Sequence, residues 1–255
     1  MIVLKSAREL ELMEAAGGMV ALCLDKVTAA VAPGVTTREL DRLAERTIRS
    51  LGGVPSFKGY RGFPASICTS INHQVVHGIP GPAVLKEGDI LSVDLGVTWE
   101  GFHGDAAVTV PVGRVEPDTE RLVETTREAL MEGIEQAQPG NRLGAISHAI
   151  QRYSEEYGFS VVRDYAGHGI GREMHERPEV PNYGPADRGP RLRTGMTLAL
   201  EPMLNAGSYQ VYVGDDEWTV LTLDGELSAH FEHTIAVTEE GPKILTRLPE
   251  AGRDG

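Results

Sequence analysis

The chain has 255 residues, of which 41% are hydrophobic and 24% are charged, so it can bury a sizeable core and is not an intrinsically disordered sequence. Its formal net charge of −13 disfavours broad binding to nucleic acid or to an anionic membrane. We see no signal peptide, and no apolar run approaches the roughly 20 residues that cross a bilayer. The only cysteines are Cys23 and Cys68, so we expect no disulfide framework and a cytoplasmic protein.

The N-terminal part of the chain predicts a pair of helices. Ser6 and Glu9 form a capping box, and apolar residues then recur at steps of three and four as far as Val31. Pro33-Gly34 ends this helix. A second helix, capped in the same way, is predicted over residues 36–51.

A similar pair of helices follows in the second half. Asp118 is expected to cap a helix that runs to about Gln138, and the next helix covers 143–157. The matching spacing of breaks and apolar positions indicates an internal duplication, although chance similarity of two helix pairs explains it as well. We expect a single catalytic domain over residues 1–255, with pseudo-symmetric halves at about 5–112 and 113–246. Residues from about 249 are expected to form a polar tail.

Strands are predicted after each helix pair. Residues 89–97 and 102–111 alternate apolar and polar residues around a turn at 99–101, which is typical of a β-hairpin. Segments 195–201 and 228–237 are expected to form its counterpart. The fold class is therefore α+β, with helices covering one face of an antiparallel sheet.

Two aspartates interrupt the first predicted hairpin. If Thr98 pairs with Gly101 across the turn, Asp94 and Asp105 lie directly opposite each other. Like charges in that arrangement destabilise a sheet unless something neutralises them, and a bound cation would do so. The alternative is that one aspartate is a turn or edge residue.

The second half repeats the pattern with glutamates. Glu201 ends the apolar run 196–200, and Glu232 interrupts another apolar segment. Four carboxylates on apolar strands are very costly to bury without metal, unless mutual repulsion keeps some of them protonated. His168 lies between two glycines and offers a neutral imidazole nitrogen as a further ligand, whereas a lone histidine is more often a surface or core residue.

One imidazole and four carboxylates form a mostly hard-oxygen set of ligands. Structural zinc sites favour Cys and His, so this is not one. Two divalent ions bridged by carboxylates would satisfy the charge. Cobalt, manganese, iron or zinc would all fit, because affinity order alone selects none of them.

At these residues the sequence resembles the type I methionine aminopeptidases, within the pita-bread fold family of metallopeptidases. The resemblance extends from about residue 5 to residue 246. It is carried by a series of motifs in order: Ser70-Ile71-Asn72, Val76-His77-Gly78-Ile79-Pro80, Asp94, Gly101-Phe102-His103-Gly104-Asp105, Gly167-His168-Gly169-Ile170-Gly171, His175, Leu200-Glu201-Pro202-Met203 and Phe231-Glu232-His233-Thr234.

The resemblance implies a role for each of these side chains. The ligands of two metal ions would be Asp94, Asp105, His168, Glu201 and Glu232. His77 and His175 would contact the substrate and take part in catalysis, and Glu201 would also transfer the proton. The apolar pocket for the methionine side chain would use Tyr60, Phe63, Cys68, Met174 and Trp218.

The implied activity is removal of the first methionine from peptides and nascent polypeptides that carry a small second residue. The resemblance also implies transient contact with the ribosome, which the acidic sequence does not specifically support. We expect a monomer that binds no specific nucleic acid and no membrane. An X-Pro aminopeptidase or prolidase, and a binding relative that has lost catalysis, are the alternatives. Relatives commonly carry Phe at the position of Met174 and Cys at that of Ala166, and His73-Gln74 is also unusual.

Overall fold

The computed structural model describes residues 1–248, so the predicted polar tail from about 249 lies outside the described residues. The helices are α1 (Ala7–Ala29), α2 (Thr37–Ser50), α3 (Pro117–Glu135) and α4 (Leu143–Glu156), with a short 3-10 turn at Tyr60–Gly62. The strands are β1 (Val54–Pro55), β2 (Cys68–Ile71), β3 (Gln74–Val76), β4 (Ile90–Trp99), β5 (Phe102–Pro111), β6 (Ser160–Val161), β7 (Ala166–Gly169), β8 (Glu176–Pro181), β9 (Thr197–Leu200), β10 (Met203–Asn205), β11 (Val211–Val213), β12 (Val220–Thr222), β13 (Ser228–His230), β14 (Glu232–Thr238) and β15 (Gly241–Ile244).

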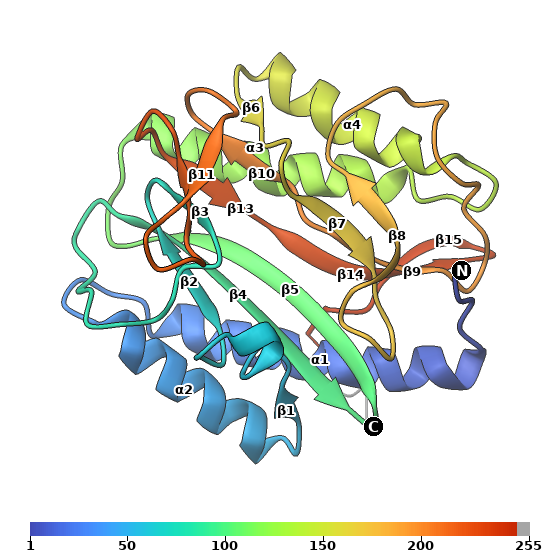
Figure 1. The fold of residues 1–255 in the computed structure, drawn as a ribbon, viewed down its shortest axis with the longest axis horizontal. Helices are drawn as coiled ribbons and strands as arrows, with labels where there is room; N and C mark the ends of the chain where they lie inside the picture. The colour runs from blue at the N-terminus through green and yellow to red at the C-terminus, as the bar shows by residue number, and fades with distance from the viewer. Residues whose placement is uncertain (249–255) are drawn as a thin grey trace, which may run out of the picture.

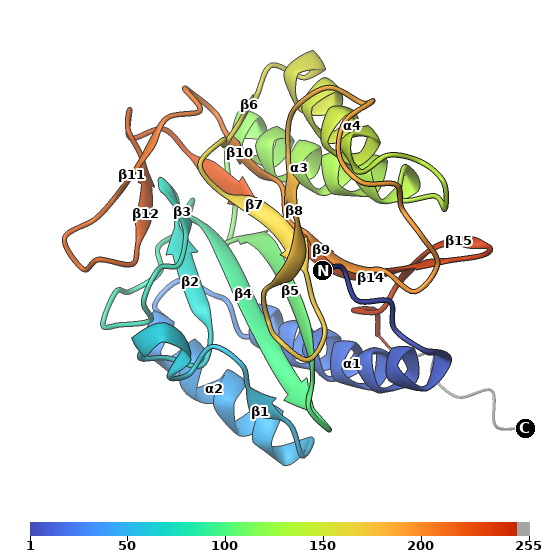
Figure 2. The ribbon, with the colours of Figure 1, turned by 45° about the vertical axis from the view of Figure 1, so that its right-hand side comes forward.

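One large curved sheet holds the two halves together. Its strands follow the order β1-β4-β5-β14-β9-β7-β8, with β2 also beside β4 and β15 also beside β14. The pairings in this sheet are antiparallel, and β5 and β14 pair at the centre, where the two halves of the chain meet. Two smaller sheets, β13-β10-β6 and β11-β12-β3, lie beside it (Figures 1 and 2).

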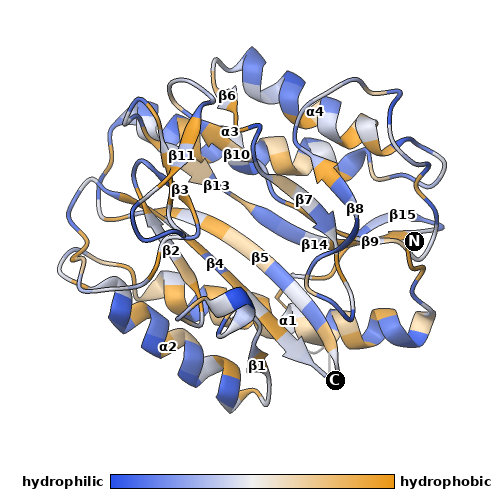
Figure 3. Cartoon of the chain, viewed as in Figure 1, coloured by the Kyte–Doolittle hydropathy of each residue, from blue (hydrophilic) through white to orange (hydrophobic). Residues whose placement is uncertain are grey.

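The helices cover one face of the sheet, as the sequence predicted. The α1–α2 pair packs against β4 and β5, where Leu91, Val93 and Leu95 join the apolar faces of both helices. The α3–α4 pair packs in the same way against β9 and β14. Hydrophilic stretches of α2 and α4 lie on the side away from the sheet (Figure 3). No helix among residues 1–248 is long and apolar enough to cross a membrane.

Helix starts agree with the sequence in the first half and differ from it in the second. Ser6 and Thr36 both complete the predicted capping boxes, with Glu9 and Glu39. The predicted cap at Asp118 is wrong, because the N-cap of α3 is Glu116 and the helix begins at Pro117, two residues earlier than predicted. Proline is favoured there because its fixed φ suits the helix and the missing N–H is not needed.

The first hairpin forms, but its register differs from the predicted one by two residues. Thr98 pairs with His103, so Asp94 lies opposite Ala107 rather than opposite Asp105. The turn is tight: Glu100 and Gly101 have φ values of 48° and 77°, and two consecutive positive φ values are typical of a two-residue hairpin turn. In the second half β9 pairs with β14, which confirms the predicted counterpart.

Candidate active site

The candidate site begins with a row of side chains across the sheet. Asp94 on β4 pairs with Ala107 on β5, which pairs with Glu232 on β14. Glu201 directly follows Leu200, the last residue of β9, which runs beside β14. The row therefore brings three carboxylates from three different parts of the sequence to one line across the sheet.

A second row lies two residues along the strands. Asp105 on β5 exchanges two hydrogen bonds between its backbone and the Thr234 hydroxyl, at 3.0 and 2.8 Å. Thr234 pairs with Ala199, and Ala199 pairs with His168 on β7. Since side chains in a strand alternate between faces, both rows share the face opposite the helices.

Small residues leave space between the polar side chains of the two rows. Gly96 pairs with Asp105, while Ala107 and Ala199 occupy the central positions of their rows. A Cβ at Gly96 would lie 3.0 Å from the Phe57 ring and from Cβ of Ser56, so the small residue there lets the loop that carries them approach the sheet. Acidic groups, rather than apolar side chains, therefore lie at the centre of the concave face of the sheet.

The carboxylates are buried at a high electrostatic cost. Asp94, Asp105 and Glu232 are between 3% and 9% exposed, and each has one oxygen with no hydrogen-bond partner among the described residues. Burial, followed by repulsion from neighbouring carboxylates, raises the pKa of Asp94 and of Glu232 well above its usual value. Burial raises the pKa of Asp105 to about 7. The same two causes raise the pKa of Glu201 well above normal.

His168 presents an unprotonated nitrogen to these acids. Its Nδ1 lies 2.8 Å from the carbonyl oxygen of Gly169, which can only accept, so Nδ1 carries the proton. Burial lowers the pKa of His168 to about 4, which keeps the ring neutral at pH 7. The bare Nε2 lies 3.5 Å from Oε1 of Glu201, so these two atoms can share a cation, or a proton when Glu201 is protonated.

The site therefore fits divalent metal ions. The ligand atoms of Asp105, His168 and Glu232 lie within 4.8 Å of one another, which is the spacing of groups that share an ion. Asp94 and Glu201 line the same cavity. Carboxylate oxygens with one imidazole suit divalent cations, and a cation would satisfy the unpartnered oxygens and offset the repulsion.

An apolar pocket opens beside the acidic cluster. The cavity has a volume of about 150 Å³. All five predicted pocket residues line it, namely Tyr60, Phe63, Cys68, Met174 and Trp218. The Phe63 and Trp218 rings meet edge to face at 5.1 Å between centroids. Burial raises the pKa of the Cys68 thiol well above normal, so this side chain acts as a small neutral hydrophobe.

Two lining residues of the same cavity, Phe57 and Arg61, were missed by the sequence analysis. Phe57 is buried in the same cluster as Phe63 and Met174. The signal for Phe57 was its place in an aromatic-rich loop before β2. Arg61 is exposed, adopts a positive φ of 49° and lies over the Tyr60 ring, and no pattern in the sequence marks it.

Both candidate catalytic histidines lie at this cavity. The Nδ1 of His175 lies 2.8 Å from the Tyr60 hydroxyl, and its ring centroid lies 4.2 Å from that of His168. Burial, together with the neighbouring His168 and Arg61, lowers the pKa of His175 to about 3. Burial also lowers the pKa of His77, whose ring meets Tyr165 edge to face. Both imidazoles are thus neutral hydrogen-bonding groups at pH 7.

The curved sheet, the helix layer and the acid–histidine cluster define a metallopeptidase. The family model described as metallopeptidase family M24 matches residues 11–239. A prolidase structure from Pyrococcus furiosus shares the fold, with a TM-score of 0.80, but at 22% identity. It covers 97% of this chain, which spans only 66% of that one. This likeness establishes the fold alone.

Much greater similarity links the chain to one group within that family. "Methionine aminopeptidase 1" of Bacillus subtilis is 54% identical over 97% of this chain and 100% of its own length. The crystal structure of methionine aminopeptidase from Thermotoga maritima has a TM-score of 0.96 at 48% identity, covering 97% of this chain and 100% of that one. The chain belongs to the methionine aminopeptidase family, of the bacterial type I class, and has its pita-bread fold.

Proposed function

We propose that this chain is a metal-dependent hydrolase that removes the N-terminal methionine from peptides and new polypeptides whose second residue is small. The observation that carries the proposal is one cavity in which an apolar pocket ends at a buried acid–histidine cluster. A substrate whose side chain fills the pocket would hold its first peptide bond at that cluster. Relatives named methionine aminopeptidases match the chain over nearly its whole length, which supports the same activity.

Two divalent ions are proposed at the cluster, each of them cobalt, manganese, iron or zinc. Asp94 and Asp105 would hold one ion, and His168 and Glu201 would hold the other. Asp105 and Glu232 would bridge the two ions, which accords with their position between the outer ligands in the rows. When bound, such ions lower the pKa of water and polarise the substrate carbonyl.

The pocket would select methionine by size and polarisability. Phe63 and Trp218 form one wall, and the buried thioether of Met174 and thiol of Cys68 add soft, polarisable surface. These side chains leave an apolar recess that opens onto the acidic cluster, where an unbranched side chain would lie against them. Met174 would fill the position that Phe occupies in relatives.

Three side chains would move or hold protons during the reaction. Glu201 would take a proton from the attacking water and pass it to the leaving amine, because its carboxylate lines the cavity at the acidic cluster. If the Tyr60 hydroxyl donates to Nδ1 of His175, the opposite nitrogen of that ring donates to the substrate carbonyl. His77, from the other side of the cavity, would hold the departing amide nitrogen.

The substrate proposal places the chain where new polypeptides are made. We propose a cytoplasmic monomer that meets polypeptide N-termini as they leave the ribosome and binds no specific nucleic acid. The net charge of −13 accords with contacts that are brief rather than broadly electrostatic.

A peptide assay tests the proposed function directly. Chelator-treated protein would be reloaded with Co²⁺, Mn²⁺, Fe²⁺ or Zn²⁺ and supplied with Met-Ala-Ser and, in parallel, with Ala-Pro peptides. We expect release of methionine from the first substrate and no cleavage of the second. Cleavage of the proline peptides alone would replace the proposal with X-Pro specificity, and no cleavage under any metal would point to a binding protein.

A further inference from the structure

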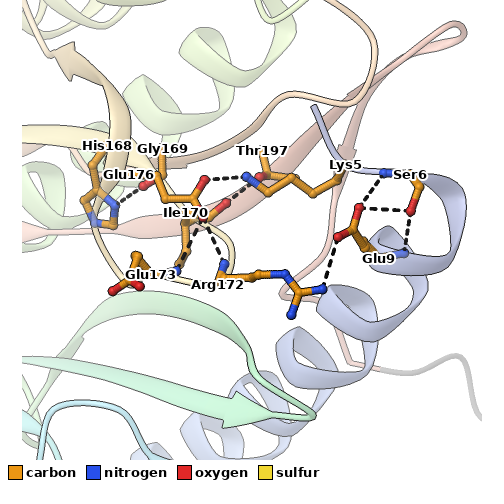
Figure 4. A network of polar contacts seen from close by, with 10 residues as sticks. All are labelled: Lys5, Ser6, Glu9, His168, Gly169, Ile170, Arg172, Glu173, Glu176 and Thr197. Atoms are coloured by element: carbon orange, nitrogen blue, oxygen red, sulfur yellow. Dashed lines mark hydrogen bonds and ion pairs between the residues drawn. The ribbon is translucent and has the colours of Figure 1, made fainter. Parts of the chain in front are cut away.

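We propose that the ion pair between Lys5 and Glu176 is a positioning device that sets His175 in the active-site cavity. Lys5 precedes α1, whereas Glu176 begins β8, directly after His175. The inference rests on the proposed function, because it assigns Lys5 a role in orienting a group that contacts the substrate. The polar network around the pair is drawn in Figure 4.

The pair is buried, unlike the other lysine and arginine ion pairs among the described residues. Lys5 Nζ lies 2.5 Å from Glu176 Oε2, and the two side chains are 4% and 12% exposed. Breaking a buried pair by removing one partner leaves an uncompensated charge, whereas intact buried pairs add little net stability. Such a pair is better suited to fixing geometry than to stabilising the fold.

The second oxygen of Glu176 holds the loop that connects β7 to β8. Oε1 accepts hydrogen bonds from the backbone N–H groups of Arg172 at 2.9 Å and of Glu173 at 3.4 Å. A Cβ on Gly171 would lie 2.5 Å from this oxygen and 2.5 Å from Cε of Lys5. The absence of a side chain at Gly171 is therefore what lets the loop close around the ion pair.

The lysine end of the pair is fixed to the main sheet. The Lys5 N–H donates to the carbonyl oxygen of Gly195 at 2.7 Å, and the Gly195 N–H donates to Val237 on β14 at 2.9 Å. Ser6 then caps α1 directly afterwards. The ion pair thus fixes the position of the β7–β8 loop relative to β14, the strand that carries Glu232.

Both ends of the loop are anchored in the sheet, where Gly169 pairs with Glu176, and the Glu176 side chain holds the loop between them. Ile170 accepts a hydrogen bond from the Thr197 hydroxyl at 2.5 Å, and Gly171 accepts one from the His103 N–H at 2.9 Å. Next to Glu176, His175 is held from the opposite wall by the Tyr60 hydroxyl at 2.8 Å. Without the ion pair, Tyr60 would hold the His175 ring while the backbone beneath it could shift.

The test is a kinetic cycle with Lys5→Met, which keeps the length of the side chain and removes the charge. With Met-Ala-Ser and the metal that gives wild type its highest activity, we expect kcat to fall about tenfold and KM to change less than threefold. Misplacement of a catalytic group by about 1 Å can cost up to ~100-fold in rate. In a His175→Ala background, Lys5→Met should lower kcat no further, because the group it positions is gone.

Lys243→Met is the matched control. Lys243 is likewise a lysine that forms an ion pair, with Nζ 2.7 Å from Oε2 of Glu14 on α1, but this pair is about half exposed. We expect its kcat to stay at the wild-type value. Glu176→Gln tests the buried pair from the other side, keeps an acceptor for the loop N–H groups, and decides the matter if Lys5→Met does not fold.

The outcomes separate this inference from the proposed function. Active wild type with unchanged kcat in both Lys5→Met and Glu176→Gln would overturn the positioning role alone. An equal further loss in the His175→Ala background would also overturn it, since Lys5 would then act elsewhere. Wild type without activity on Met-Ala-Ser would overturn the proposed function itself.

Discussion

At the scale of single residues, the site depends on charges placed where apolar side chains are normal. Asp94 and Glu232 lie in strands whose other residues are almost all buried, and neither carboxylate has a salt-bridge partner among the described residues. Burying a carboxylate without a partner costs free energy, so these residues do not stabilise the fold by themselves. Their presence is better explained by a bound cation. His168 adds a neutral imidazole nitrogen, which would complete the proposed set of ligands.

Glu201→Gln should reduce kcat for Met-Ala-Ser by on the order of 100-fold or more, because a well-placed proton acceptor contributes roughly 10²–10⁴-fold to the rate. Glu156→Gln, on the exposed surface of α4, is the control and should be fully active. Steady-state kinetics with circular dichroism on the same samples checks both. Wild-type kcat in a folded Glu201→Gln variant would refute its role as the base.

Met174→Ala should lower kcat/KM for Met-Ala-Ser about tenfold, mainly through KM. Met174 is buried in the wall of the pocket, and shortening an apolar contact there costs about 1–3 kcal/mol of binding. Competition between methionine and norleucine peptides measures the change. An unchanged kcat/KM would place the substrate side chain elsewhere.

Sequence reasoning found all five candidate ligands that line the cavity but not the whole pocket. A carboxylate within a run of apolar strand residues is unusual, and this can be recognised from a single sequence. Phe57 and Arg61 are not unusual in this way, because an aromatic residue or an arginine in a loop is ordinary. Their approach to the cavity depends on how the loop before β2 folds back, including the positive φ of Arg61, which no local pattern specifies.

At the scale of elements, the alternation of strand side chains decides which residues meet. The predicted register of the first hairpin was wrong by two residues, yet Asp94 and Asp105 still share a face. An even shift preserves the face, whereas a shift of one residue would have turned one carboxylate toward the helices. The error arose because the predicted turn, Trp99-Glu100, lies one residue before the turn of equal length at Glu100-Gly101 that forms.

Ala107→Leu tests this arrangement of rows. Ala107 lies between Asp94 and Glu232, so a larger side chain should fill the space for the ions and weaken Mn²⁺ binding at least tenfold. Val108→Leu, at the next position and on the helix face, is the matched control and should bind Mn²⁺ normally. Isothermal titration calorimetry on both variants makes the comparison. Equal affinities would mean that the rows do not enclose the metal site.

At the scale of the whole molecule, two helix-covered halves of the core meet at the site. One apolar cluster lies under α1 and α2 and the other under α3 and α4, and Val108 of β5 contacts both. The ligands come from both halves, so the acidic cluster exists only when the halves are assembled. The internal duplication that this arrangement suggests stays a prediction, since similar helix pairs can arise separately.

The metal-free protein should lose stability as pH rises. The pKa of Asp105 is about 7 in the folded protein, compared with 3.8 for the free side chain, so the folded state binds more protons between these values. Stability contributed by this group is therefore fully present below pH ~4 and is lost as pH rises through about 7. The raised pKa values of Asp94, Glu201 and Glu232 act in the same direction. The lowered pKa values of His168 and His175 act in the opposite direction, but only as pH rises through 6.5, so the loss of stability is expected above pH 7.

Thermal unfolding of chelator-treated protein at pH 7, 8 and 9, above the range in which histidines titrate, checks this expectation. We expect the melting temperature to fall by several degrees across the series and excess Mn²⁺ to reverse most of the fall, because bound ions stabilise the folded state and favour ionised ligands. Protein that melts at the same temperature at all three values, with and without Mn²⁺, would show that the cluster carries no electrostatic strain.

The most direct test of the central claim is an anomalous difference map from crystals soaked in manganese. We expect two peaks on the concave face of the sheet, enclosed by Asp94, Asp105, His168, Glu201 and Glu232. Peaks elsewhere, or carboxylates that turn away from one another toward solvent with no ion among them, would contradict it.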